Sequence, residues 1–381
     1  MADKTDQQIP WVEKYRPKAL VEIVSQESTI KLMKKFVENG NLPHLLFHGP
    51  PGTGKTTTIL ACARELYGKM FPQMTLELNA SDDRGIDTVR TQIKTFAETR
   101  SIQSQLPKLI ILDECDAMIK EAQFALRRVV EMYSSNARFC LICNYVSRII
   151  PALQSRCTKM RFTPLDPEAV FGRIMNVVHA EKIRCNEEAC KSIVNLSGGD
   201  MRKALNTLES VHMAYETITV DAVYATLGKP HPREMQQFLE VSLNKPYEEA
   251  VDTCWRQKQA GMLSLSDLVV GVHDRVVRLD LPIPVKCVLL DRLAQIAYNA
   301  TKGVGSDERV QFVALVAALQ ECRVSTMKVA AIAVQAGIFR PLTAIDKDNN
   351  NDEIVVGLLK GAQVDLDNEG KTESKKEMTK D

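Results

Sequence analysis

The segment that most constrains the fold of this chain runs from Gly49 to Thr56 and reads Gly-Pro-Pro-Gly-Thr-Gly-Lys-Thr. It fits the pattern G-x-x-x-x-G-K-[ST] at every fixed position. A strand-like apolar run at 45–47 precedes it, and the apolar residues of 57–66 recur at helical spacing. A glycine-rich turn between a strand and a helix can point consecutive backbone N–H groups at phosphates. A plain Gly/Pro turn would explain the glycines but not the Lys-Thr pair.

This loop predicts a site for ATP and Mg²⁺. We expect the Lys55 ammonium to meet the β and γ phosphate oxygens, and the Thr56 hydroxyl to take one coordination position of Mg²⁺. The expected nucleotide-binding residues of the loop are Gly49, Pro50, Pro51, Gly52, Thr53, Gly54, Lys55, Thr56 and Thr57.

A second motif, 108–115, places two carboxylates after an apolar run and reads Lys-Leu-Ile-Ile-Leu-Asp-Glu-Cys. The run suits a strand buried on both faces, and ligands of open α/β sheets sit at the carboxyl ends of such strands. We expect Asp113 to hold Mg²⁺ and Glu114 to polarise a water for attack on the γ-phosphate. A solvated acidic turn is the alternative, which the nearby phosphate loop disfavours.

Strands alternate with helices from residue 45 to 162, which predicts a parallel sheet covered on both sides by helices. The chain has 381 residues, enough for two or three domains, and 45% hydrophobic and 25% charged residues describe an ordinary globular protein. With a net charge of +1, the chain as a whole does not attract nucleic acid, so any DNA-binding site must be a local group of basic residues. Ten scattered cysteines predict free thiols in an intracellular protein; only Cys140 and Cys143 are spaced as C-x-x-C, and with no second pair nearby they are expected to be buried strand residues. No run is long enough to span a membrane.

Several further motifs give the chain a family resemblance. They are Glu13-Lys14-Tyr15-Arg16-Pro17, the stretch from Leu78 to Gly85, Asn144 at a strand end, Ser155-Arg156-Cys157, and Gly198 to Arg202. With these motifs and the two described above, the chain resembles an AAA+ ATPase of the clamp-loader kind, specifically a replication factor C small subunit. The segments 139–145 and 150–157 most resemble the branch called subunit 3 in yeasts and 5 in animals.

The resemblance implies three more catalytic residues. Asn144 looks like sensor 1, which orients the attacking water; a strand-ending Asn that only bonds a loop is the alternative. Arg156 looks like an arginine finger acting in trans on the γ-phosphate of a neighbouring subunit, with a surface Arg as the alternative. Arg202 resembles sensor 2, which bends over the phosphates in cis, with a helix N-terminal surface charge as the alternative.

The resemblance also places ligands outside these motifs. Val12, Arg16 and Val24 fall where relatives line the adenine and ribose side of the pocket. Arg84 and Arg90 match positions that follow the phosphate backbone of DNA, contacts that give affinity without reading sequence. A solvated helix face is the competing interpretation for both arginines.

The expected organisation follows from the same resemblance and from the helical periodicity after residue 164. Residues 1–163 form the AAA+ P-loop domain, 164–228 a small helical lid, 232–325 an all-helical collar for oligomerisation, and 341–381 a disordered tail.

The implied function is ATP hydrolysis coupled to loading a sliding clamp onto primer-template DNA, in replication and repair, within a nuclear hetero-pentamer of replication factor C subunits. A structural scaffold subunit with little turnover of its own is the alternative, which the intact Lys55, Asp113 and Glu114 disfavour. An AAA+ unfoldase or helicase would require pore loops or a translocating insertion, and neither is visible in the sequence.

Overall fold

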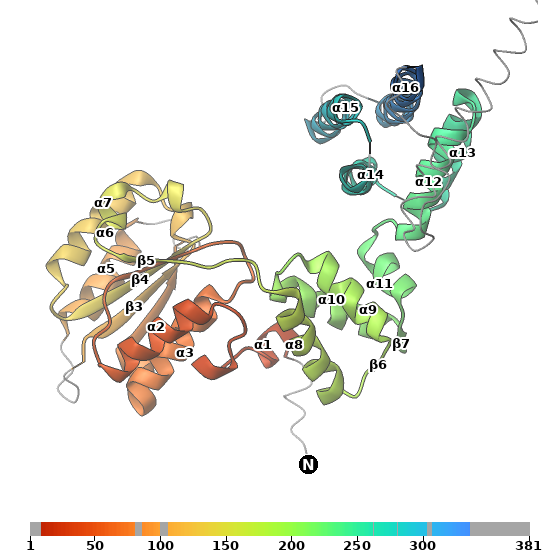
Figure 1. Cartoon of the computed structure of the whole chain (residues 1–381). Coiled ribbons are helices and arrows are strands. Elements are labelled where there is room, and N and C mark those ends of the chain that lie inside the picture. The colour runs from red at the N-terminus through yellow and green to blue at the C-terminus, as the bar shows by residue number, and fades with distance from the viewer. Residues whose placement is uncertain are drawn as a thin grey trace, which may run out of the picture. The chain divides into compact units, whose positions relative to one another are not determined.

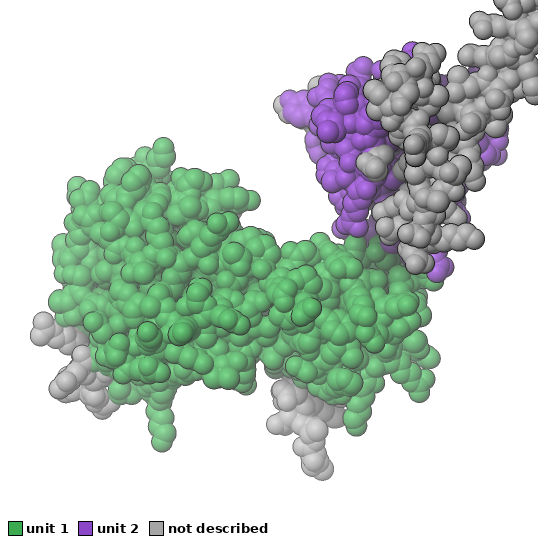
Figure 2. Space-filling model, in the orientation of Figure 1, with its two compact units in different colours: residues 1–226 green, residues 227–381 purple. Residues whose placement is uncertain are grey.

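The computed structural model describes residues 9–80, 86–99, 106–261, 263–279, 281–302 and 307–335, without the side chains at 86–90, 302, 327 and 329–335. The chain divides into two compact units, residues 1–226 and 227–381, coloured separately in Figure 2. Hydrophobic core clusters form within each unit. The tail predicted at 341–381 lies outside the described residues.

The first unit contains a five-stranded parallel sheet, three strands of which are labelled in Figure 1. The strand order is β2-β3-β4-β1-β5. Its strands are β1 (Leu45–His48), β2 (Thr75–Asn79), β3 (Lys108–Asp113), β4 (Ala137–Cys143) and β5 (Thr158–Arg161). The apolar residues of β3, from Leu109 to Leu112, are fully buried, because helices cover both faces of a parallel sheet. The predicted α/β fold is confirmed.

Side chains alternate between two cores along the central strands. In β1, Leu45 and Phe47 pack with α2 (Glu27–Glu38) and α3 (Lys55–Tyr67), whereas Leu46 joins the opposite core. That opposite core takes side chains from α5 (Ile86–Glu98), α6 (Lys120–Met132) and α7 (Pro151–Gln154). The result is a three-layer arrangement, and all five carboxyl ends of the strands lie at one edge of the sheet.

Short helices complete this part of the chain. They are α1 (Trp11–Lys14), η2 (Leu20–Glu22), η3 (Gly68–Met70), α4 (Phe71–Met74), η4 (Cys115–Ala117) and η5 (Val146–Arg148).

The lid follows β5 and consists mainly of α8 (Pro167–Ala180), α9 (Glu187–Ser197) and α10 (Met201–Ala214). Two of these helices begin at side chains that cap them: Asn186 accepts from the backbone N–H of Glu188, and Asp200 from that of Lys203. The lid also contains a small parallel sheet, β6 (Arg184–Cys185) with β7 (Thr217–Ile218), which the sequence analysis did not predict. α11 (Val220–Leu227) spans the division between the units.

The regular elements described in the second unit are all helices. Its helices are α12 (Pro232–Asn244), α13 (Tyr247–Ala260), α14 (Leu265–Arg278), α15 (Ile283–Lys302) and α16 (Glu308–Gln335). Their core centres on Phe312, which contacts the rings of Phe238 and Trp255 edge-on at centroid distances of 6.1 and 5.1 Å.

Candidate active site

The glycine-rich loop connects β1 to α3 and has a left-handed backbone conformation at two of its glycines. Gly52 has φ +67° and Gly54 has φ +90°, both in the left-handed region that favours glycine. A Cβ on Gly52 would lie 1.6 Å from Asp200 Oδ1, so the loop also approaches the lid too closely for a larger residue. α3 begins at Lys55, directly after this turn, and its first N–H groups form an anion-binding end.

Lys55 is buried and its ammonium is fully engaged. Nζ donates to the carbonyl oxygens of Gly49 and Pro50, both at 2.8 Å, and to Asn144 Oδ1 at 3.0 Å. Burial lowers the pKa of Lys55, and the charge of Asp113 partly offsets that effect. The side chain is therefore fixed where strands β1 and β4 end, ready to meet an anion.

Thr56 and Asp113 meet across the site. The Thr56 hydroxyl, in the first turn of α3, donates to Asp113 Oδ2 at 2.6 Å, while Asp113 Oδ1 accepts from the backbone N–H of Glu114 at 2.8 Å. Hydroxyl and carboxylate oxygens are hard ligands of the type Mg²⁺ prefers, and phosphate oxygens complete such a shell. These two residues therefore fit a Mg²⁺ site.

Glu114 and Asn144 lie at the same edge of the sheet and are both exposed. Glu114 has φ +54°, in the left-handed region that is uncommon for a residue with a side chain, at the turn between β3 and η4. Asn144 follows β4, and its backbone N–H, with that of Tyr145, donates to Asp116 Oδ2 at 3.2 and 3.1 Å. Asp116 thus holds the turn that carries Asn144, a role the sequence analysis missed.

A cavity of about 490 Å³ lies over this edge of the sheet. The predicted residues that line it are Val12, Arg16, Val24, Pro51, Gly52, Thr53, Gly54, Lys55, Thr56, Thr57, Asp113, Glu114, Asn144 and Arg202. Gly49 and Pro50 reach the site through the carbonyl groups that Lys55 contacts.

The N-terminal segment forms one wall of the cavity and is fastened on both sides. Arg16 Nε donates to Thr57 Oγ1 at 3.4 Å, next to the glycine-rich loop. From the lid, Arg173 Nη2 donates to the Tyr15 carbonyl at 2.9 Å, and the backbone N–H of Trp11 donates to Glu209 Oε2 at 3.2 Å. The segment therefore connects the phosphate loop with the lid.

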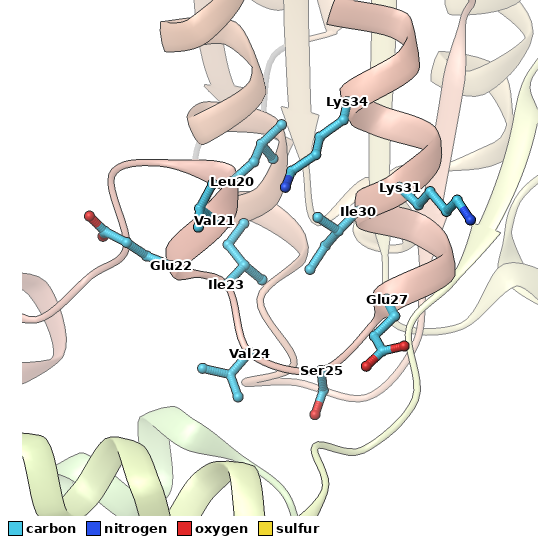
Figure 3. Close-up of a pocket in the computed structure, with 10 residues that line it drawn as sticks. All are labelled: Leu20, Val21, Glu22, Ile23, Val24, Ser25, Glu27, Ile30, Lys31 and Lys34. Atoms are coloured by element: carbon cyan, nitrogen blue, oxygen red, sulfur yellow. The ribbon is translucent and has the colours of Figure 1, made fainter.

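A second cavity, of about 550 Å³, lies between the chain at 20–25 and α2 (Figure 3). Ile23 and Val24 line both cavities, whereas Lys31 and Lys34 belong to the second alone. Its lining contains neither the glycine-rich loop nor the two carboxylates after β3, so the cavity over the sheet edge is the candidate active site.

Three family descriptions match the chain in order. "ATPase family associated with various cellular activities (AAA)" matches residues 45–165, "RCF1/5-like, AAA+ ATPase lid domain" residues 172–213, and "Replication factor C C-terminal domain" residues 230–318. The "Replication factor C subunit 5" of Mus musculus is 48% identical, with 83% of this chain and 93% of the relative covered. The chain belongs to the replication factor C family. "Replication factor C subunit 3" of Schizosaccharomyces pombe is 46% identical, covering 82% of this chain and 91% of its own.

The names of these relatives confirm the resemblance to the branch called 5 in animals and 3 in yeasts. As a member of the AAA family, this replication factor C chain belongs to the nucleotide-binding ATPases. Among the residues that the structure describes, no helix combines the length and the apolar character that crossing a membrane requires.

Three predicted arginines are not among the described residues that line the cavity of this replication factor C chain. Arg156 is absent from the cavity lining; it pairs with Glu131 on α6 and donates from Nη1 to the Ala152 carbonyl at 2.7 Å. Arg84 lies outside the described residues, and Arg90 lies on α5 with its side chain outside them. The structure therefore does not test these arginines as ligands.

Other residues of the cavity were missed. They are Glu13, Tyr15, Pro17, Ile23, Asn79, Leu165, Arg173, Met201 and Leu205. Asn79 ends β2, and the rule that located Asp113 and Asn144 at strand ends could have found it. Arg173 lies inside a lid helix, where only a tertiary contact across 158 residues brings it to Tyr15.

Proposed function

We propose that this chain is an ATP-hydrolysing subunit of a nuclear hetero-pentameric clamp loader, which places a sliding clamp on primer-template DNA in replication and repair. One observation carries the proposal: in a chain of the replication factor C family, a single cavity gathers Lys55, Asp113, Glu114, Asn144 and Arg202.

The contacts of Lys55 support a role in binding the phosphates of ATP. Its ammonium donates to two neutral carbonyl groups and one amide oxygen. A phosphate oxygen in the cavity would replace some of these with a charged acceptor, which makes a hydrogen bond roughly twice as strong. Thr56 and Asp113 would hold Mg²⁺, which, when bound, neutralises charge on the β and γ phosphates.

Hydrolysis in this proposal requires a positioned water rather than a covalent intermediate. Glu114 accepts the proton of the attacking water, and Asn144 orients that water through its amide. Arg202 approaches from the start of α10, and the Gly52 carbonyl accepts from the backbone N–H of Met201 beside it at 3.2 Å. That contact gives the lid a direct mechanical link to the phosphate loop.

In this proposal, three further arginines contact the partners of the chain. Arg156 acts on ATP bound to the next replication factor C subunit, and Arg84 and Arg90 contact the phosphates of primer-template DNA. ATP binding orders the ring and its grip on the clamp, and hydrolysis releases clamp and DNA. A scaffold subunit without turnover would have no use for Glu114, which the cavity retains.

Two substitutions in the full chain test the site. Lys55→Ala should weaken ATP binding by about 100-fold, because a hydrogen bond to a charged group contributes about 1.5–3 kcal/mol. Glu114→Gln should retain ATP affinity but slow hydrolysis at its own site by about 10²–10⁴-fold, measured in the assembled complex with the other sites silenced, since an amide cannot act as the base.

A fluorescent ATP analogue measures the affinity, and phosphate release measures the turnover. Lys69→Ala is the matched control, because Lys69 is an exposed lysine just after α3. Equal affinity for Lys55→Ala and Lys69→Ala would refute the site, and undiminished turnover in Glu114→Gln would refute the base.

A further inference from the structure

Two cysteines of the lid lie in direct contact. Cys185 ends β6 and is half-buried, and Cys190 is buried in the second turn of α9. Their Sγ atoms are 2.9 Å apart. Both are free thiols, and a disulfide bond of about 2.05 Å requires the sulfurs to approach by less than about 1 Å.

The surroundings of Cys185 act in both directions: its thiol donates to the Asn186 carbonyl at 3.3 Å, which favours the protonated form, whereas the contact with Cys190 favours the thiolate. The contact with the Cys190 thiol lowers the pKa of Cys185, although burial opposes it. The sulfur also lies near the N-terminus of α9, whose dipole stabilises an anion. Glu187 and Glu188 act against this effect, but Glu187 is paired with Lys191 at 2.8 Å.

Other cysteines of the chain have the opposite tendency. Burial raises the pKa of Cys62 to about 12 and that of Cys157 to about 11, so these thiols remain protonated and unreactive. Cys190 is also held protonated, since its hydrogen bond to Cys185 and its burial raise its pKa. The pair thus combines a partly accessible thiol of lowered pKa with a neighbouring buried thiol, an arrangement found at redox-sensitive sites.

We propose that Cys185 and Cys190 form a redox-modification site, closed to a disulfide by peroxide and reopened by dithiol reductants. The Cys185 thiolate attacks one oxygen of hydrogen peroxide, the O–O bond breaks, and Cys185 becomes a sulfenic acid. The departing hydroxide takes up the proton that the Cys185 thiol released and becomes water. Cys190 then attacks that sulfur, the S–O bond breaks, and water leaves. Two thiols are oxidised by two electrons in total, and one peroxide is reduced to two waters.

A disulfide between Cys185 and Cys190 would connect two elements of the lid. Cys185 pairs with Ile218 of β7, and the backbone N–H of Asn186 donates to the Ile218 carbonyl at 3.1 Å. The disulfide would tie this small sheet to the second turn of α9, within the lid. The proposal concerns thiol chemistry alone and does not depend on ATP hydrolysis.

The experiment treats the reduced full-length chain with one equivalent of hydrogen peroxide, denatures it and alkylates it. Peptide mass mapping should show Cys185 linked to Cys190 with the loss of two hydrogens, and the ten alkylatable thiols should fall to eight. Dithiothreitol should restore all ten. Cys287, an exposed single thiol on α15, is the internal control and should remain alkylated.

Two variants assign the roles of the sulfurs. In Cys190→Ala, peroxide should leave a sulfenic acid on Cys185 that dimedone captures, because no resolving thiol is present. In Cys185→Ala, Cys190 should stay alkylatable. If Cys190→Ala does not fold, because this side chain is fully buried, Cys185→Ala and the wild-type map decide the question. Peroxide treatment that leaves both thiols alkylatable in the wild type, or that oxidises Cys287 first, would overturn the proposal.

Discussion

The contact between the phosphate loop and the lid predicts a difference between two glycine substitutions. Gly52 and Gly54 both have left-handed φ angles, but a Cβ on Gly52 would overlap Asp200 Oδ1, whereas one on Gly54 meets nothing within 4 Å. Left-handed backbone costs a residue with a side chain about 1–2 kcal/mol, so each Ala variant should lose that amount of stability.

Gly52→Ala should lose about 1 kcal/mol more than Gly54→Ala. The added methyl group must displace the Asp200 carboxylate, whose Oδ1 accepts from the backbone N–H of Lys203 at 3.0 Å and caps α10. Loss of such a cap costs about 1 kcal/mol. The expected losses are therefore about 1–2 kcal/mol for Gly54→Ala and about 2–3 kcal/mol for Gly52→Ala.

Urea denaturation followed by tryptophan fluorescence measures this difference. The chain has two tryptophans, and in a Trp255→Phe background the signal comes from Trp11 alone, which is buried and stacks on His212 within the first unit. All variants are compared in that background, so the change in the second unit cancels.

A double-mutant cycle then tests the cause. In an Asp200→Ala background the carboxylate is gone, so Gly52→Ala and Gly54→Ala should cost the same, which gives a coupling of about 1 kcal/mol between Gly52 and Asp200. Equal losses from the two glycine substitutions with Asp200 present, or an unchanged difference after its removal, would refute the proposed steric contact.

Three further predictions concern other parts of the chain. Arg156→Ala should leave its own ATP affinity intact but slow turnover at the neighbouring site by about 10³-fold, measured in the assembled complex with the other sites silenced; normal turnover there would rule out a finger. Reversing Arg84 and Arg90 to Glu should weaken primer-template binding for all sequences and flatten the salt dependence by about 1 unit per lost phosphate contact, so an unchanged slope would place both in solvent. Burial, aided by the charge of Arg138, lowers the pKa of His44 below its ordinary 6.5. The unfolded chain therefore binds the proton more readily, and the free energy of unfolding should decline as pH falls below about 6.5. In His44→Asn, the midpoint of urea unfolding should decline less over the same pH range.

Local patterns in the sequence were sufficient to predict where Asp113 and Asn144 lie in the fold. The run at 109–112 is buried on both faces, as its continuous apolar character predicted, and this placed Asp113 at a strand end. β4 ends at Cys143, so Asn144 emerges at the same edge on the neighbouring strand. These predictions succeeded because strand burial and parallel pairing depend on patterns of a few residues.

Other features depend on contacts that no local pattern contains. The order β2-β3-β4-β1-β5 is set by how the crossover helices pack, and the chain order of the strands does not give it. β6 and β7 have two residues each, too few to show any periodicity, and the pairing of Cys185 with Ile218 is a tertiary contact within a lid whose helices α9 and α10 pack together. The same holds for Arg173, which reaches the cavity from a lid helix.

The contacts of Arg156 bear on how the chain could supply a finger to a neighbouring subunit. Its guanidinium pairs with Glu131, whose carboxylate also accepts from Arg127 Nε at 3.1 Å. These two arginines lower the pKa of Glu131, Arg127 through its hydrogen bond first, so the carboxylate stays ionised. Because about a third of the Arg156 side chain is exposed, solvent screens the pair and its release costs little. Arg127 would still pair with Glu131 after that release, and a γ-phosphate in a water-excluded interface would offer Arg156 more charge than the carboxylate does. The exchange therefore favours the phosphate only where a neighbouring subunit excludes water, which would make the use of Arg156 conditional on assembly.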